Sequence, residues 1–189
     1  VLRSAQAIDV RGASITLGAV DAGGTLTADA TDRLAIDVVS ATGGGELTSA
    51  GAATFDTISA GGPLAIDAGG TLSFGEISGT SIAANGVTIT GDSLRATDTI
   101  DLGGTTVTLG LAEAGAALTI NAAEALRIET VTAGTSAALT SGGTATFGTV
   151  AATGPLAIDT AGALSFDQLS GGVIRATAAM IAGDTLRSP

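Results

Sequence analysis

The side chains most able to carry chemistry in this chain are carboxylates and arginines, because it contains no His, Lys, Cys or Tyr. A carboxylate beside a basic group, or beside a second carboxylate, can perform acid–base catalysis. Two positions bring such groups close in sequence, Asp9/Arg11 and Asp32/Arg33. Gly103 and Ala125 replace the two arginines 92 residues later, so neither pair recurs in the repeat described below. We therefore interpret both pairs as solvated surface charges, expect no catalytic residues, and predict that the chain is not an enzyme.

Two glycine-rich segments could hold an ion, Gly43-Gly44-Gly45-Glu46 and Gly23-Gly24-Thr25. Calcium-binding toxin repeats need an Asp after Gly-Gly-x-Gly, and neither segment has one. A phosphate loop needs Lys-Ser/Thr after its glycines, which the first segment also lacks. Asp67 and Asp159 lie where corners of the fold are expected, and turn chemistry accounts for them. The sequence therefore predicts no metal site, no cofactor-binding residues and no cofactor.

Paired threonines on neighbouring strands could order water, as in ice-binding solenoids. Such pairs occur at Thr88/Thr90 and Thr106/Thr108. The next coil has Arg127 and Glu129 and interrupts the row of threonines. The residues 92 positions after Thr88 and Thr90 are Met180 and Ala182, so the pair does not recur. Ordinary strand propensity of β-branched residues explains these threonines.

Composition excludes several classes of partner. The net charge is -11, so the chain lacks the clustered cations that bind nucleic acid or an anionic membrane surface. Polar residues interrupt every apolar stretch well before the roughly 18 residues that a membrane span needs. The absence of Cys suits export from a bacterium. With 2% aromatic residues and 29 Gly, the chain can build only a thin, closely stacked core.

The chain repeats itself at a spacing of 92 residues. Gly62–Asp67 (GPLAID) returns unchanged as Gly154–Asp159, and Leu2-Arg3-Ser4 returns after two periods as Leu186-Arg187-Ser188. A fixed period is typical of solenoids and arrays. We expect one solenoid segment over 1–189, an excerpt of a longer array, with repeat 1 at 2–93, repeat 2 at 94–185 and the start of repeat 3 at 186–189.

A shorter period lies within each repeat. Apolar anchors recur in steps of 18, 21, 17, 18 and 18 residues, and the series then repeats, at Ile8, Leu26, Leu47, Leu64, Ile82, Ile100, Leu118, Leu139, Leu156 and Ile174. The segments are short, rich in Thr, Val and Ile, and strictly alternating, which indicates strands. The sequence predicts an all-β parallel solenoid of about ten coils of 17–21 residues, and two 92-residue super-repeats. At about 4.8 Å per coil its length should be about 48 Å.

The alternation also predicts which side chains face the core. Residues two apart share a face of a strand, so Ile15 and Leu17 should point inward, as should Val87 and Ile89. Phenylalanines recur 19 residues apart and should stack on consecutive coils, Phe55 on Phe74 and Phe147 on Phe166.

Residues that tolerate a left-handed backbone recur three positions after most anchors. We expect sharp corners there, at Asp29, Asp67, Asn85, Gly103, Asn121, Gly142 and Asp159. Arg11, Ala50 and Thr177 are the exceptions.

The phrases Gly62–Leu72 (GPLAIDAGGTL) and Asp21–Ala28 (DAGGTLTA) resemble the Ala-Gly-Gly-x-Leu-x-Leu cadence of filamentous haemagglutinin-like exoproteins. These are large bacterial adhesins secreted by the two-partner route, and the resemblance covers the whole chain. It implies a right-handed parallel β-helix, an extended surface fibre, and contact with host cells or neighbouring bacteria. The 92-residue super-repeat departs from that family's usual run of near-equal coils.

The expected function is that of a structural or adhesive stalk in a large bacterial cell-surface or secreted protein. Expected partners are neighbouring repeats of the same chain and a cell-surface glycan, protein or like fibre, with no nucleic acid and no membrane insertion. Two alternatives remain: a self-assembling extracellular filament or sheath subunit, and a carbohydrate-binding or carbohydrate-processing β-helix. An inserted loop or an aromatic platform would favour the carbohydrate alternative, and the sequence has neither.

Overall fold

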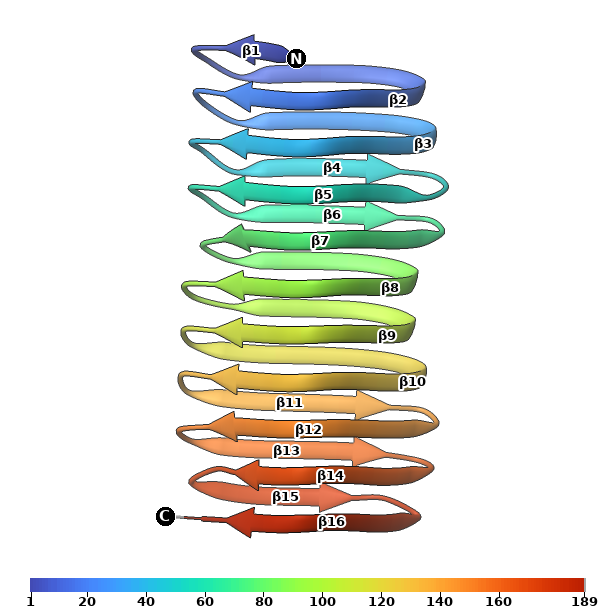
Figure 1. The fold of residues 1–189 in the computed structure, drawn as a ribbon, viewed down its shortest axis with the longest axis vertical. Coiled ribbons are helices and arrows are strands. Elements are labelled where there is room, and N and C mark those ends of the chain that lie inside the picture. Colours follow the sequence, from blue (N-terminus) through green and yellow to red (C-terminus); the bar gives the residue numbers. More distant parts are fainter. Residues whose placement is uncertain (189) are drawn as a thin grey trace.

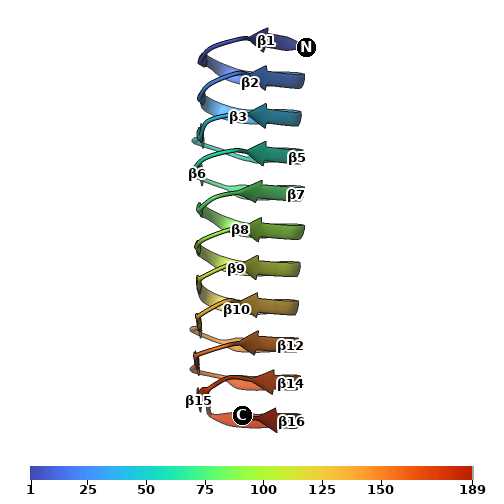
Figure 2. The same ribbon diagram turned by 90° about the vertical axis from the view of Figure 1, so that its left-hand side faces the viewer.

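The computed structural model describes residues 1–188, and within them it contains strands and no helix. The strands stack in one column (Figure 1), which is narrower when turned by 90° (Figure 2). They are β1 (Leu2–Ser4), β2 (Ile8–Ala22), β3 (Leu26–Ala41), β4 (Gly45–Ser49), β5 (Ala53–Ala60), β6 (Leu64–Ala68), β7 (Thr71–Gly79), β8 (Ile82–Ala96), β9 (Ile100–Ala114), β10 (Ala117–Ala133), β11 (Ser136–Ser141), β12 (Thr144–Ala152), β13 (Pro155–Thr160), β14 (Ala163–Ser170), β15 (Val173–Thr177) and β16 (Met180–Arg187).

Every strand pairs in parallel with the strand one coil away, and together they form a single 16-stranded sheet. The long strands β2, β3, β8, β9 and β10 pass round both broad sides of the column. On the other coils the two sides are formed by separate, shorter strands. One side contains β4, β6, β11, β13 and β15, and the other contains β5, β7, β12, β14 and β16. Parallel pairing normally needs a separate crossover element, but here each completed coil is its own crossover. The predicted parallel β-solenoid is confirmed.

The register between coils corrects two of the predicted steps. Leu26 pairs with Gly45, and Gly45 pairs with Leu64, so these two coils are each 19 residues long rather than 21 and 17. The predicted anchor Leu47 pairs with Ala28, two residues further along the same face. Leu139 is displaced in the same way, because Ala137 is the residue that pairs with Leu118 and Leu156. A small residue at the anchor position caused the error, since the pattern was read from bulky side chains.

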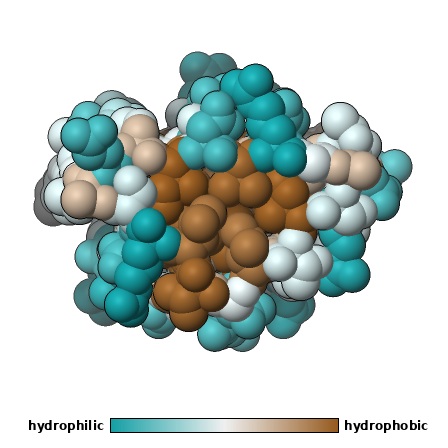
Figure 3. Space-filling view, turned by 90° about the horizontal axis from the view of Figure 1, so that it is seen from above, coloured by the Kyte–Doolittle hydropathy of each residue, from teal (hydrophilic) through white to brown (hydrophobic). Residues whose placement is uncertain are grey.

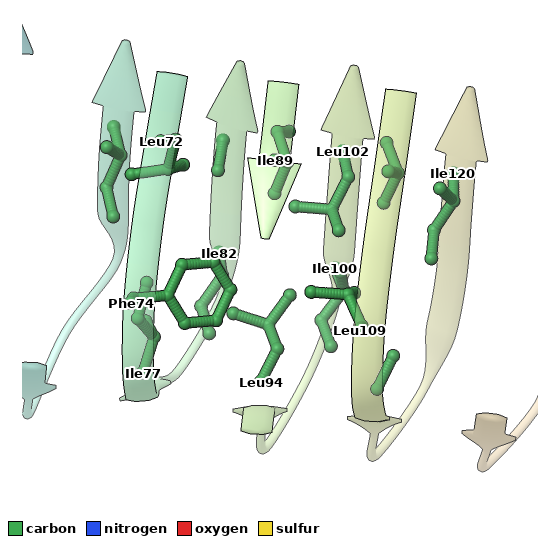
Figure 4. Close-up of a cluster of buried hydrophobic side chains, with 14 of the residues drawn as sticks. Leu72, Phe74, Ile77, Ile82, Ile89, Leu94, Ile100, Leu102, Leu109 and Ile120 are labelled. Atoms are coloured by element: carbon green, nitrogen blue, oxygen red, sulfur yellow. The ribbon is translucent and has the colours of Figure 1, made fainter. Parts of the chain in front are cut away.

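One hydrophobic core runs the length of the column. Figure 4 shows its middle, where the ring of Phe74 on β7 points toward Leu94 on β8. Both predicted aromatic stacks are confirmed: Phe55 is paired with Phe74 and Phe147 with Phe166, and all four rings are buried. The predicted inward orientation of Val87 is wrong, because this side chain is 52% exposed. Val87 precedes the paired segment that begins at Thr88, so it lies where the chain bends between two sides.

The predicted left-handed corners are also wrong. No residue between 1 and 188 has a positive φ. The predicted corner residues Asp29, Asp67, Asn85, Gly103, Asn121 and Asp159 share one register position inside the strands, and most of them are exposed. Gly142 is not in this row, and Thr140 takes its place. Polar residues collect here because the position faces solvent just before the bend.

Candidate functional site

The two acid–arginine pairs considered for catalysis both lie on the outside of the column. Arg11 forms an ion pair with Asp9 at 3.2 Å, and both side chains are more than half exposed. Asp32 accepts a hydrogen bond of 3.0 Å from the Ser14 hydroxyl of the preceding coil. Exposed pairs of this kind are strongly hydrated and contribute little free energy. The arrangement offers no enclosed space in which either carboxylate could hold a reacting group.

Two further ion pairs connect neighbouring coils and recur with the 92-residue period. Arg3 lies 3.8 Å from Asp21, and Arg95 lies 3.7 Å from Glu113. Sequence reasoning missed these pairs because their members are 18 residues apart. The recurrence of Leu2-Arg3 as Leu94-Arg95, together with the acids one coil later, was the signal that could have found them.

In the glycine-rich segment Gly43–Gly45, the amides of Gly43 and Gly45 are engaged by neighbouring turns. The Gly43 N–H donates to the Gly24 carbonyl, and the Gly45 N–H donates to the Pro63 carbonyl, both at 2.9 Å. These amides are therefore not free to bind an anion. Asp67 and Asp159 lie exposed on their strands. Across residues 1–188 no group of three or more acidic, His or Cys side chains is arranged to hold a metal ion.

The threonine pairs lie side by side as expected, and one more coil joins them. Thr88 pairs with Thr106, and Thr90 with Thr108. On the other side, Thr71 pairs with Thr88 and Ser73 with Thr90, so paired hydroxyls span three coils. Thr54 pairs with Ser73 and carries one of the two rows to a fourth coil. Past Thr106 and Thr108 both rows end at the next coil, where Ala125 and Arg127 take these positions. The hydroxyls therefore form a small polar patch and not a continuous row along the column.

One surface groove, of about 600 Å³, lies over the C-terminal ends of β5, β7, β8 and β9 and the turns that follow them. Ser78, Thr80, Arg95 and Glu113 are among its lining residues. Most of its polar groups already have partners within the chain: the Ser78 hydroxyl donates to the Ile58 carbonyl at 3.3 Å, and Arg95 pairs with Glu113. The groove therefore lacks the unpaired, convergent polar groups that fix a small ligand.

A second groove, of about 380 Å³, carries charged residues on β10 and β14. Arg127, Glu129 and Asp167 line it. Its counterpart in the first repeat has Ala35 in place of Arg127, so the charge arrangement does not recur. Neither groove combines buried acid–base groups with an enclosed space.

Comparison with known proteins gives no family for this chain: no family model, no curated protein and no solved structure matches it. Within residues 1–188 no helix is long and apolar enough to cross a membrane. The most extensive feature of the structure is the column itself, with its apolar interior and its largely polar surface.

Proposed function

We propose that this chain is a segment of a stiff extracellular stalk that holds an attachment surface away from a bacterial cell. The observation that carries the proposal is the unbroken stacking of parallel strands from β1 to β16 around one hydrophobic core, whose buried side chains run from Ile8 to Leu169. Each coil buries its apolar face only against its neighbours, so length can be added without a new core. Such a column is suited to spanning a distance.

The chemistry of the surface supports an adhesive and non-catalytic role. The ionisable side chains are spread over the outside of successive coils, and the ion pairs among them are exposed. A long, regular and accessible surface offers many weak contacts, which act together when several are engaged at once. The extracellular location is supported by the net charge of -11, the absence of Cys and the resemblance to haemagglutinin-like exoproteins.

The proposal is tested by measuring shape as a function of length. Polypeptides of two, three and four 92-residue repeats should scatter X-rays as rods of constant cross-section. Each repeat has five coils, so the rod should lengthen by about 24 Å per repeat at about 4.8 Å per coil. Compact or flexibly bent particles would contradict the stalk.

Attachment is tested separately. Beads coated with the folded polypeptide should bind cultured epithelial cells or bacteria more often than beads coated with the heat-unfolded polypeptide. Equal binding by the two bead types would remove the adhesive part of the proposal and leave the structural part.

A further inference from the structure

The groove of about 380 Å³ on β10, β12 and β14, called the β10–β14 groove below, differs from the larger groove in the state of its polar side chains. A ligand meets the column at its outer polar side chains, which surround the apolar centre when the molecule is viewed along its length (Figure 3). In this groove they are Arg127, Glu129, Thr146, Ser165 and Asp167, all exposed. Within residues 1–188, none of these five side chains makes a hydrogen bond or an ion pair. Convergent polar groups of this kind orient a small ligand.

The polar residues of the groove form two short rows over three consecutive coils. The first row contains the register partners Arg127, Thr146 and Ser165. The second row contains Glu129, Gly148 and Asp167, which follow the paired and buried residues Ile128, Phe147 and Phe166. Neighbours within a row are about 4.8 Å apart, and the rows are about 6.6 Å apart along the strands. The groove therefore presents donors and hydroxyls on one side and two carboxylates on the other.

Gly148 leaves a gap between the two carboxylates of the second row. The three atoms nearest to an added Cβ are backbone atoms of Glu129, and no side chain is among them. Glu129 and Asp167 are two coils apart, which is about 9.6 Å. A ligand that donates a hydrogen bond of about 2.7 Å to each carboxylate therefore needs two donor oxygens roughly 4 Å apart. Hydroxyls on non-adjacent carbons of a pyranose ring have a separation of this size.

Other classes of ligand fit the groove less well. A calcium ion needs several oxygen ligands at about 2.3–2.6 Å, and carboxylates two coils apart cannot share one ion. An anionic ligand would meet two carboxylates and a single guanidinium. An extended peptide needs an open strand edge, whereas β10, β12 and β14 are each paired on both sides. A neutral polyhydroxy compound suits the groove, because its hydroxyls donate to carboxylates and accept from an arginine.

We propose that the β10–β14 groove binds a hexose unit of a neutral glycan. Glu129 and Asp167 accept hydrogen bonds from two hydroxyls of the sugar, and Arg127 donates to a third oxygen. The inference rests on the proposed attachment role and names the class of ligand. An open groove exchanges these hydrogen bonds with water, so the Kd should be in the range of about 1 mM. Many stalks on one cell would then act together.

The first repeat supplies a matched control, because it has the same backbone with different side chains. Ala35, Asp56 and Gly75 occupy the positions of Arg127, Gly148 and Asp167. Asp56 shows that an aspartate is accommodated at the position that is empty in the second repeat. Gly148→Asp should therefore fill the gap, keep the fold and abolish binding. Ala35→Arg/Asp56→Gly/Gly75→Asp should create a second site in the first repeat.

An NMR titration of the ¹⁵N-labelled polypeptide tests the site. The probes are neutral tetrasaccharides of glucose, mannose and galactose, a tetrasaccharide of galacturonic acid, and calcium chloride. At least one neutral probe should shift the amide signals of Thr146, Gly148 and Ser165, and the acidic probe should not. Asp167→Asn should weaken binding by about five-fold, because a charged acceptor becomes neutral. Asp56→Asn, in the same row of the first repeat, should leave binding unchanged.

The proposal is overturned if no neutral probe shifts these signals, if Gly148→Asp responds as the unsubstituted chain does, or if calcium chloride alone reproduces the shifts. The bead assay separates this result from the proposed function. Bead binding without a response to the tetrasaccharides would remove the glycan site and keep the attachment role. A response to a tetrasaccharide without bead binding would keep the site and remove the attachment role.

Discussion

Gly91 lies next to Phe74 in the stack, and its missing side chain leaves room for the ring. The two residues are register partners, and a Cβ added to Gly91 would overlap three atoms of the Phe74 ring. Gly183 stands in the same relation to Phe166. The succession of two phenylalanines and a glycine at one inward position therefore repeats every 92 residues. It gives this super-repeat a physical basis, because the second ring of each stack, Phe74 or Phe166, extends into the space that the following glycine leaves free.

The variant Gly91→Ala is expected to destabilise the chain by about 1–3 kcal/mol, because overpacking a filled core forces the ring to move. Gly18→Ala is the matched control. Its backbone φ is not positive, and the nearest atom to an added Cβ is a carboxylate oxygen of Asp37 at 3.8 Å. This control should be stabilised by about 0.4–1 kcal/mol through the unfolded state. Urea unfolding of both variants measures the two changes.

A double-mutant cycle separates overpacking from a general intolerance of strand changes. Phe74→Ala alone should cost about 3–5 kcal/mol, since the ring is buried. Adding Gly91→Ala to that background should cost much less than it does alone, because the clash has been removed. If the stability losses of the two substitutions were additive, the Phe74 ring would not be the reason why a side chain at position 91 is unfavourable.

At the scale of the coil, alternation predicted the strands well, because an inward position repeats every second residue. Leu72 and Phe74, for example, are both buried as the pattern indicates. Register was predicted less well, since it depends on the residue that occupies a position and not on the bulkiest residue nearby. A hydrophobic pattern cannot detect Gly45 at an anchor position, so the nearby Leu47 was predicted as the anchor instead.

The bends show a second limit of sequence reasoning. Asp, Asn and Gly predicted left-handed corners, yet the chain bends through irregularities in an extended backbone. The pairing of β2 with β3 shifts between Gly12 and Ser14, and that of β10 with β9 shifts between Ala122 and Ala125. Small shifts of this kind bend a strand without a positive φ, and composition alone does not distinguish them from turns.

A buried serine secures one such bend in each repeat. The Ser49 hydroxyl is close to the carbonyls of Asp32 and Ala52, at 3.2 and 3.1 Å, and Ser141 makes the equivalent contacts with Glu124 and Thr144. We expect Ser49→Ala to cost about 0.5–1.5 kcal/mol, because a hydrogen bond to the bend is lost while the small volume is kept. Thermal unfolding measures this cost.

The control for that variant is Ser59→Ala, because Ser59 lies exposed on the outer face of β5. It should change the stability by less than about 0.5 kcal/mol. An equal effect of the two substitutions would mean that the buried hydroxyl does not hold the bend.

At the scale of the whole molecule, the sequence predicted the architecture better than the surface. The 92-residue period and the inward rows determine a stacked column, because each coil must bury its apolar face on the next. The pairing of Arg95 with Glu113 and the extension of the threonine patch to Thr71 depend on the lateral register. That register is given by the three-dimensional structure and does not follow from the sequence pattern.

The same dependence of each coil on its neighbours predicts how stability changes with length. In a solenoid the free energy of unfolding is close to a sum of repeat and interface contributions. Adding one 92-residue repeat adds five coils and one more junction like that between β8 and β9. Polypeptides of two, three and four repeats should therefore unfold in urea at rising midpoint concentrations, as long as each unfolds as one cooperative unit. The slope of the unfolding free energy against urea concentration should also grow, because it scales with the surface exposed on unfolding. The measurement is made at concentrations below the onset of association, so that contacts between chains do not contribute. A midpoint and a denaturant dependence that stay constant from two to four repeats would mean that the 189 residues fold as a self-sufficient unit, and stacking would no longer explain how the column is stabilised.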